Sequence, residues 1–244
     1  TVLSTSAGSA STSIAVGDYD GDGFIDLSVV NSTANLVSVY RNTTGIAGGM
    51  PSFASQPVTL TTGTSPIVMR MGDLDGDGRS DIIVVNASTN NTLSVFQNQS
   101  VSGTISFVPQ LVVATGANPR SLVVGDLDGD GKPDLSVVST NANAIYVLRN
   151  VSTLGNINLV PAITLTTGTS PGSIMIGDFN GDSMLDLATA NAVSNNVSVF
   201  QNQSTLGNIS FAARANFSTG AGSGPTILAV GDTDGDGKPD MTTS

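Results

Sequence analysis

The chain contains no cysteine, histidine, tryptophan or glutamate among its 244 residues. Without cysteine and histidine it has no thiol nucleophile, no disulfide and no imidazole base, and the usual ligands of zinc, haem and copper are missing. Catalytic triads of the Ser-His and Cys-His kinds are excluded for the same reason. We therefore expect a protein that is not an enzyme.

Basic residues and long apolar runs are also scarce. Only 8 Lys and Arg residues stand against 19 acidic ones, and the net charge is −11. Because nucleic acid is bound by clustered Lys and Arg, we expect no nucleic-acid partner. No apolar run approaches the roughly 20 residues that a membrane helix needs, so we expect no membrane span.

All the acidic residues are Asp, and they fall in five short clusters with one spacing. Each cluster follows the pattern Asp-x-Asp-x-Asp-x-x-x-Asp, with Gly at the fourth and usually the sixth position. The candidate metal ligands are the side chains at positions 1, 3, 5 and 9 and the backbone carbonyl at position 7. They are Asp18, Asp20, Asp22, Phe24 and Asp26; Asp73, Asp75, Asp77, Arg79 and Asp81; Asp126, Asp128, Asp130, Lys132 and Asp134; Asp178, Asn180, Asp182, Met184 and Asp186; and Asp232, Asp234, Asp236, Lys238 and Asp240.

This pattern matches the ligand preference of calcium. Ca²⁺ takes six to eight oxygen ligands at about 2.3–2.6 Å, and a glycine at position 6 allows the sharp turn that lets them converge. Four carboxylates held together without a cation would repel one another. Five Ca²⁺ ions would add +10 to the net charge of −11 and leave about −1. We therefore predict about five calcium ions, with the Asp at position 9 as a bidentate ligand.

An EF-hand shares positions 1, 3, 5 and 6 of this pattern but ends in an acidic ligand at position 12 and continues into a helix. Here position 12 is Val29, Val84, Val137, Thr189 or Thr243. The residues that follow the clusters are rich in β-branched side chains, which is typical of strands. The sequence thus predicts loops that join two strands, and an EF-hand is rejected.

The clusters recur at steps of 55, 53, 52 and 54 residues, with four strand-like segments in each period. Four short strands per repeat, separated by Gly, Asn, Ser and Thr turns, are typical of a propeller blade. The sequence therefore predicts an all-β fold, a single β-propeller domain of about four and a half four-stranded blades over residues 1–244. We place the repeats at about 1–52, 53–106, 107–158, 159–210 and 211–244.

The Gly-Asp-x-Asp-Gly-Asp-Gly-x-x-Asp loops between strands resemble FG-GAP or VCBS-type repeats, the calcium-binding blades of integrin α-subunit propellers and many bacterial extracellular proteins. This resemblance covers essentially the whole chain. It implies a propeller with a structural Ca²⁺ in the loop of each blade, and functions in adhesion, in lectin-like sugar binding or as an accessory module of larger enzymes. The fourth cluster departs from the pattern, because Ser183 replaces the turn glycine and Asn180 replaces an Asp. We expect it to be the weakest of the five sites.

The two ends of the chain also depart from a whole number of blades. Thr1-Val2-Leu3 is similar to the fourth strand at Val58-Thr59-Leu60, and residues 241–244 match a second strand. Four whole blades and an incomplete fifth are expected. Three explanations stay open: a fragment of a longer propeller, a ring closed by a three-stranded blade, or self-association in which a neighbouring chain completes the open edge head to tail.

Ten Asn-x-Ser/Thr sequons occur in the chain. Four of them directly follow the third strand of successive repeats, at Asn42, Asn98, Asn150 and Asn202. They would carry surface glycans if the protein is a glycoprotein. We favour the alternative that Asn caps a turn there and that duplication of the turn copied the sequon.

The function expected from these features is that of a non-catalytic, calcium-stabilised propeller outside the cell or on its surface. It would act in adhesion, in recognition of an extracellular protein or glycan, or in surface assembly as a head-to-tail oligomer or filament. The alternatives are a lectin-like carbohydrate-binding module and an accessory fragment of a polysaccharide-degrading enzyme. A repeated aromatic sugar platform is absent, because the chain has no Trp and only three Tyr.

Overall fold

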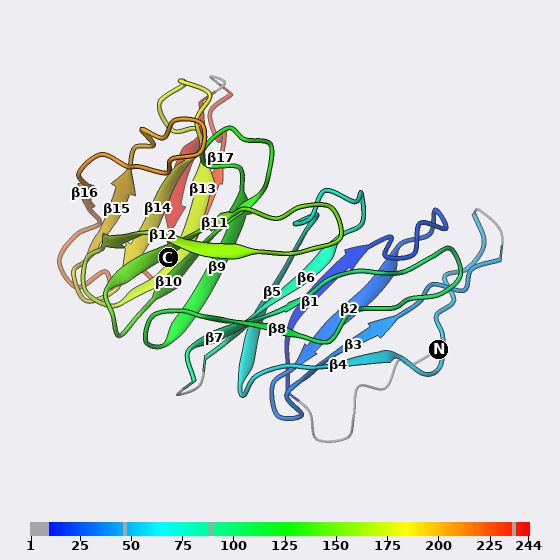
Figure 1. Cartoon of the computed structure of the whole chain (residues 1–244). Coiled ribbons are helices and arrows are strands. Elements are labelled where there is room, and N and C mark those ends of the chain that lie inside the picture. Colours follow the sequence, from blue (N-terminus) through cyan, green and yellow to red (C-terminus); the bar gives the residue numbers. More distant parts are fainter. Residues whose placement is uncertain (1–9, 46–47, 88–89, 236–237) are drawn as a thin grey trace. The chain divides into compact units, whose positions relative to one another are not determined.

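The computed structural model describes residues 10–45, 48–87, 90–235 and 238–244, and over these residues it contains strands and no helix (Figure 1). The strands form five antiparallel sheets, here called blades 1 to 5, each built in chain order. The first strands are β1 (Ser11–Gly17), β5 (Pro66–Gly72), β9 (Pro119–Gly125), β13 (Pro171–Gly177) and β17 (Leu228–Gly231). The second strands are β2 (Asp26–Asn31), β6 (Asp81–Asn86), β10 (Asp134–Ser139), β14 (Asp186–Asn191) and β18 (Asp240–Thr243). The third strands are β3 (Leu36–Tyr40), β7 (Thr92–Phe96), β11 (Ala144–Asn150) and β15 (Asn196–Phe200), and the fourth are β4 (Val58–Thr61), β8 (Leu111–Ala114), β12 (Leu159–Thr166) and β16 (Ala215–Ser218).

The all-β fold of repeated four-stranded sheets predicted from the sequence is confirmed. Each sheet begins with the strand before an Asp cluster, so the four sheets of four strands span residues 11–61, 66–114, 119–166 and 171–218. Their limits therefore lie later in the chain than those of the repeats placed on the sequence. The segment Thr1-Val2-Leu3, expected as a fourth strand, lies outside the described residues. Within the described ranges there is no helix of the length and apolarity that membrane spanning requires.

The chain divides into two compact units, residues 1–114 with blades 1 and 2, and residues 115–244 with blades 3 to 5. In the first unit, one face of blade 1 packs on the facing side of blade 2. Val37 and Leu60 of blade 1 share a buried cluster with Ile82 and Phe96 of blade 2. Val37 pairs with Leu60, and Ile82 pairs with Phe96, so each sheet contributes cross-strand neighbours that project from one face.

The second unit repeats this packing between blades 3 and 4. Ile145 and Leu165 of blade 3 lie in one buried cluster with Leu187 and Phe200 of blade 4. Period-2 alternation gives blade 4 two apolar faces, because Leu187 packs towards blade 3 while Ala188 shares a second cluster with Leu228 of blade 5. The second strands, covered on both faces, are the most deeply buried segments of their sheets.

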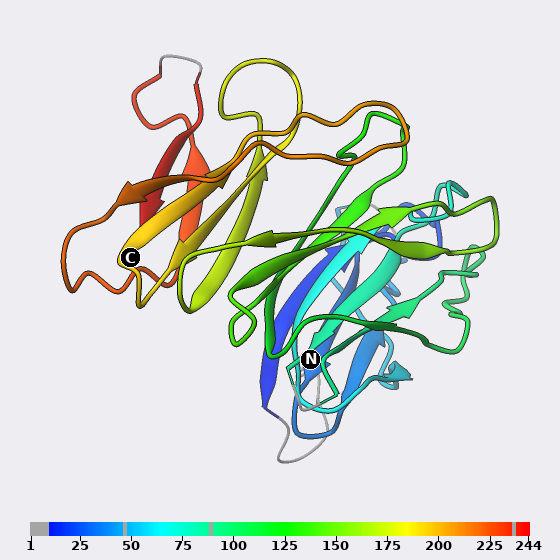
Figure 2. The ribbon, with the colours of Figure 1, turned by 60° about the vertical axis from the view of Figure 1, so that its left-hand side comes forward.

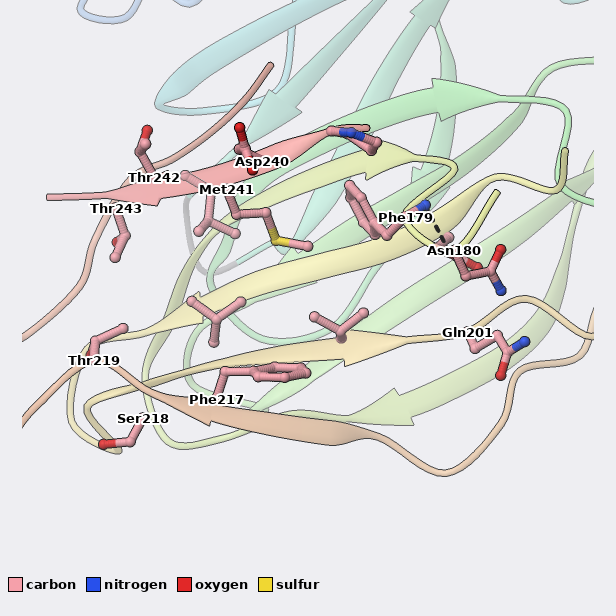
Figure 3. A pocket seen from close by; sticks show the side chains of 15 residues that line it. Phe179, Asn180, Gln201, Phe217, Ser218, Thr219, Asp240, Met241, Thr242 and Thr243 are labelled. Carbon is pink, nitrogen blue, oxygen red and sulfur yellow. Dashed lines mark hydrogen bonds between the residues drawn. The ribbon is translucent and has the colours of Figure 1, made fainter. Parts of the chain in front are cut away.

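Blade 5 has two strands in the described residues (Figure 2) and covers only part of blade 4. Phe217 is 58 % exposed, whereas Leu60 and Leu165 at the matching register positions of blades 1 and 3 are 8 % and 7 % exposed. A groove of about 570 Å³ results, with Phe217 and Met241 on opposite sides of it (Figure 3). The partly covered face of blade 4 therefore carries an apolar groove.

The blades differ in side-chain size at one pair of neighbouring positions, the last residue of the second strand and a central residue of the third strand. In blades 2 and 4 an Asn at the end of the second strand donates to a Ser on the third strand, from Asn86 to Ser94 and from Asn191 to Ser198, over 3.0 and 2.9 Å. In blade 3, Ser139 stands at the position of the Asn, and Tyr146 stands at the position of the Ser. The larger aromatic ring fits there because Gly116 leaves room beside it.

Replacing Gly116 by Ala should lower the stability of the protein. The added Cβ would overlap the Tyr146 ring, and overpacking of this kind costs about 1–3 kcal/mol. The second change Tyr146→Ser, which restores the side chain found in the other three blades, should recover most of the loss. Urea unfolding measures both, with Gly45→Ala as the control because a Cβ at Gly45 meets open space. Equal stability of the Gly116→Ala and Gly45→Ala variants would contradict this packing.

A candidate metal centre in each blade

The five Asp clusters are the loops between the first and second strands, here called loops 1 to 5 after their blades. The Gly before each cluster pairs with the Asp at position 9, as Gly17 pairs with Asp26, so position 9 is the first residue of the second strand. Strands flank every loop, which confirms the rejection of an EF-hand. In loop 1, Gly21 and Gly23 have φ values of 71° and 87°, a left-handed conformation that glycine adopts without strain.

The Asp at position 1 organises the backbone of the loop. In loop 1, the Gly21 N–H donates to Asp18 Oδ1 and the Gly23 N–H to Asp18 Oδ2, both over 2.8 Å. Loops 2, 3 and 4 repeat these two bonds over 2.7–2.8 Å. Position 7 is fixed by its own N–H, which donates to the Asp at position 5, as from Phe24 to Asp22 over 2.9 Å. Arg79, Lys132 and Met184 make the equivalent bond in loops 2, 3 and 4.

The Asp at position 9 ties the loop to the third strand. Asp26 accepts the Tyr19 N–H at Oδ2 over 2.9 Å and the Asn42 N–H at Oδ1 over 2.7 Å. Asp81, Asp134 and Asp186 accept the same two backbone donors in their own blades. Both oxygens of this carboxylate therefore accept hydrogen bonds from backbone N–H groups. Each retains a further lone pair, so a bidentate role must coexist with these bonds.

Carboxylate oxygens of four loops converge closely enough to share one cation. One oxygen from each of three Asp residues lies within 4.8 Å of the others in the sets Asp18, Asp20, Asp22; Asp73, Asp75, Asp81; Asp126, Asp128, Asp134; and Asp232, Asp234, Asp240. Ligands at about 2.3–2.6 Å from one ion can lie at most about 5 Å apart. The sites offer hard oxygen donors alone, and their geometry fits a divalent ion such as calcium. Asp236, predicted as a ligand of loop 5, lies outside the described residues.

In loops 1 to 4 the carboxylate at position 9 has a raised pKa, whereas in loop 5 hydrogen bonds from Thr233 lower the pKa of Asp240. Burial, together with the smaller effect of the neighbouring carboxylates of each loop, raises the pKa of Asp81 to about 7 and that of Asp134 to about 6. The pKa values of Asp26 and Asp186 are raised for the same reason. A buried carboxylate among like charges favours its neutral form, and a bound cation reverses this preference.

Loop 4 differs from loops 1 to 3 in the way its sequence suggests. Ser183, which replaces the turn glycine, has a φ of 69°, a conformation that costs a non-glycine residue about 1–2 kcal/mol. Asn180 directs its amide group at Asp182 Oδ2 over 2.8 Å, and both side chains belong to exposed residues. The matching Asp20, Asp75 and Asp128 of the first three loops are buried. The carboxylates of loop 5 at Asp232 and Asp234 are exposed as well.

The repeated Asn at the end of the third strand or just after it locks the loops, a role that was not predicted from the sequence. Asn98 is fully buried and donates to the Ser80 carbonyl of its own loop over 3.1 Å and to the Tyr19 carbonyl of loop 1 over 2.9 Å. In the second unit, Asn202 bonds in the same way to Leu185 of its own loop and to Leu127 of loop 3. An Asn of one blade therefore fastens the loop of the preceding blade.

The same residues explain the four regularly placed sequons. The Asn98 Oδ1 accepts the Ser100 N–H over 2.9 Å, and the Ser100 Oγ accepts the Ser106 N–H over 3.0 Å. The sequons at Asn42, Asn150 and Asn202 show the same bond from the N–H two residues ahead. These four Asn side chains are buried within the fold. At these positions the structure favours the turn-capping interpretation over surface glycans.

The residue before that Asn also faces the loop, and its role was missed as well. Arg41 donates to Asp20 and Asp22 of loop 1, and Arg149 donates to Asp128 and Asp130 of loop 3. The signal was present in the sequence as an alternation of Arg41, Gln97, Arg149 and Gln201 directly before the repeated Asn.

The fold and these loops define a protein built of repeated, four-stranded blades of the β-propeller type with Asp-rich loops. The model of the FG-GAP-like repeat matches residues 18–84, 73–137 and 178–242, which together make up more than half of the chain. The chain belongs to the FG-GAP-like repeat family. No curated protein matches it.

Solved structures of propeller type are similar in fold. BBS1N in its complex with ARL6DN, soaked with lead, is 11 % identical with a TM-score of 0.58, and the match covers 90 % of this chain and 60 % of that one. Putative 6-phosphogluconolactonases from Bacteroides uniformis and Bacteroides fragilis are 13 % and 15 % identical, with TM-scores of 0.60 and 0.59, over 86 % of this chain and 56 % of theirs. The chain thus spans less than two thirds of the length of these structures. At this identity the likeness shows the fold alone.

Replacing Asn98 by Ala should destabilise the first unit. The change removes three side-chain hydrogen bonds and leaves the buried carbonyl of Tyr19 and the half-buried carbonyl of Ser80 without this donor, at a cost of about 3 kcal/mol. Urea unfolding measures the loss. Asn208→Ala is the matched control, because Asn208 also begins a sequon but is exposed. A variant at Asn98 that is as stable as the control would show that the bridge to loop 1 contributes little.

Proposed function

We propose that this chain is a non-catalytic, calcium-stabilised propeller that acts outside the cell or on its surface as a recognition module. The observation that carries the proposal is the repeated convergence of three carboxylate oxygens within 4.8 Å in four loops. Five loops share this pattern in the sequence, so about five Ca²⁺ ions are proposed. The residues that would hold each ion are those at positions 1, 3, 5 and 9, with the carbonyl at position 7.

Calcium is favoured over other divalent ions by the chemistry of the loops. The donors are oxygens throughout, and Ca²⁺ accepts the large and irregular ligand sets that a nine-residue loop supplies. Mg²⁺ demands a compact octahedral arrangement and keeps much of its water. Exposed loops such as loops 4 and 5 suit an environment with millimolar calcium, which supports a location outside the cell.

The location of the loops gives the ions a structural role. Loop 1 lies under the Asn98 side chain of blade 2, and loop 3 lies under Asn202 of blade 4. An ion in either loop would fix the carboxylates and the backbone that the next blade binds. Calcium would therefore stabilise the contact between blades as well as the hairpin that holds it.

The hairpins between third and fourth strands support recognition at the edge where the loops lie. Met50, Val101, Leu154 and Leu206 occupy these connections in blades 1 to 4 and are between 64 % and 88 % exposed. The Gly103 N–H of the blade 2 hairpin reaches Asp20 of loop 1 over 3.1 Å, which places this hairpin beside the loop. Exposed apolar side chains in the same connection of each blade suit a protein partner better than a sugar, which usually stacks on aromatic rings.

A non-catalytic role is supported by the assignment of the acidic residues. Every carboxylate of the chain belongs to a loop cluster, which leaves no second pair for acid–base chemistry such as glycoside hydrolysis. A lectin-like module and an accessory part of a polysaccharide-degrading enzyme stay as alternatives, and a glycan array with turnover assays separates them. Self-association through the edge of blade 5, beside the groove of Figure 3, stays a prediction.

Removal of calcium should lower the melting temperature. A ligand at a thousandfold excess over its dissociation constant stabilises the folded state by about 4 kcal/mol per site, so several ions together should shift the melting temperature by many degrees. Protein freed of metal by chelation is measured by calorimetry before and after addition of CaCl₂. MgCl₂ at the same ionic strength is the control and should restore less. A melting temperature that calcium leaves unchanged would refute calcium stabilisation.

A further inference from the structure

Two of the loops are bound by an arginine that lies at the end of the third strand of their own blade or directly after it. The Arg41 Nε donates to Asp20 Oδ2 over 2.6 Å and its Nη2 to Asp22 Oδ2 over 2.5 Å. In blade 3 the Arg149 Nε donates to Asp128 Oδ2 over 2.5 Å, and Nη2 to Asp130 Oδ2 over 2.7 Å. Each guanidinium thus bridges the carboxylates at positions 3 and 5, which are two of the proposed ligands.

Blades 2 and 4 have glutamine where blades 1 and 3 have this arginine. The Gln97 Nε2 donates to Asp75 Oδ2 over 2.6 Å and carries no charge. Asp77 of loop 2 instead receives Arg79, a residue of the loop itself, over 2.5 Å. In blade 4 the matching residue is Gln201, which is exposed. A single guanidinium therefore bridges positions 3 and 5 in loops 1 and 3, and in loops 2 and 4 no such bridge occurs among the described residues.

The bridges lie in a protected place. The side chains of Asp20 and Asp128 have no exposed surface, and those of Arg41 and Arg149 are 29 % and 23 % exposed. The hairpin of the next blade covers each bridge, since the positions of a Cβ on Gly103 and Gly207 lie 3.9 and 3.6 Å from the respective Nη2 atoms. Charge-assisted bidentate pairs in such surroundings are strong and restrict geometry.

We propose that Arg41 and Arg149 are positioning residues that divide the loops into two classes. Each holds the carboxylates at positions 3 and 5 together without an ion, so loops 1 and 3 keep their form when calcium is low. The same positive charge repels a divalent ion a few ångströms away, so loops 1 and 3 bind Ca²⁺ more weakly than they would with glutamine. This inference rests on the proposed function for its second part, and its first part concerns the metal-free protein alone.

Two opposite effects decide the outcome of removing the arginine. Loss of the bridge frees two carboxylates that must then be ordered by the ion, which lowers affinity. Loss of the charge removes a repulsion that even in water corresponds to about a tenfold change in affinity at ~6 Å. The repulsion is larger in the partly buried loops, so charge should prevail and affinity should rise.

The test replaces Arg41 and Arg149 by Gln, singly, which creates the side chain that blades 2 and 4 already have. Arg120→Gln is the matched control, since it removes the same charge from an exposed position on β9. Melting of the metal-free protein and calorimetric titration with CaCl₂ are measured on all variants. R41Q and R149Q should each melt several degrees lower without metal, and each should move one site to about tenfold tighter binding. R120Q should do neither.

The reverse change Gln97→Arg keeps the test decisive if R41Q and R149Q fail to fold. It should raise the metal-free melting temperature and weaken one site by about tenfold. Unchanged or weaker calcium binding in R41Q and R149Q would overturn the affinity difference and leave the arginines a purely structural role. An unchanged metal-free melting temperature in R41Q, R149Q and Q97R would overturn the positioning role. Absence of calcium binding in the unaltered protein would refute the proposed function, and the metal-free melting would still decide the positioning role.

Discussion

The mutual repulsion of buried carboxylates is the constraint on which the rest of this structure depends. Asp20, Asp75 and Asp128 are buried beside further carboxylates of their own loops. Backbone N–H groups offset part of the negative charge at positions 1 and 9, and Arg41, Arg79 and Arg149 offset another part. What remains is a cluster of oxygens with a net negative charge, arranged at the separation that one divalent ion requires.

Because loops 1 and 3 are also contacts between blades, the repulsion of their carboxylates affects the packing of each unit. Asn98 and Asn202 reach from one blade to the loop of the preceding one, 79 and 75 residues away in the sequence. The apolar faces of the sheets pack in the same order, blade 1 on blade 2 and blade 3 on blade 4. Hydrophobic burial and loop geometry therefore stabilise the same neighbour relation. A change in a loop should be felt in the adjacent sheet.

The sequence alone was sufficient for the fold class, the strands and the loops. Period-2 patterns, a fixed repeat and turn glycines are local features, and Gly21 and Gly23 adopt the left-handed conformations that the pattern demands. What it could not show were contacts between segments far apart in the chain. Asn98 was read as a turn residue of its own blade, and its bond to the Tyr19 carbonyl depends on how two sheets stack. The approach of Arg41 to loop 1 likewise depends on the pairing of β2 with β3.

The most direct test of this account is a diffraction experiment on crystals grown with calcium, in which anomalous differences locate the ions. The account predicts peaks between the oxygens of positions 1, 3, 5 and 9 in loops 1, 2, 3 and 5, with a weaker peak in loop 4. It also predicts that the Asn98 and Asn202 bridges persist beside the occupied loops. Loops that keep their carboxylates together without any such peak, at calcium concentrations in the millimolar range, would contradict it.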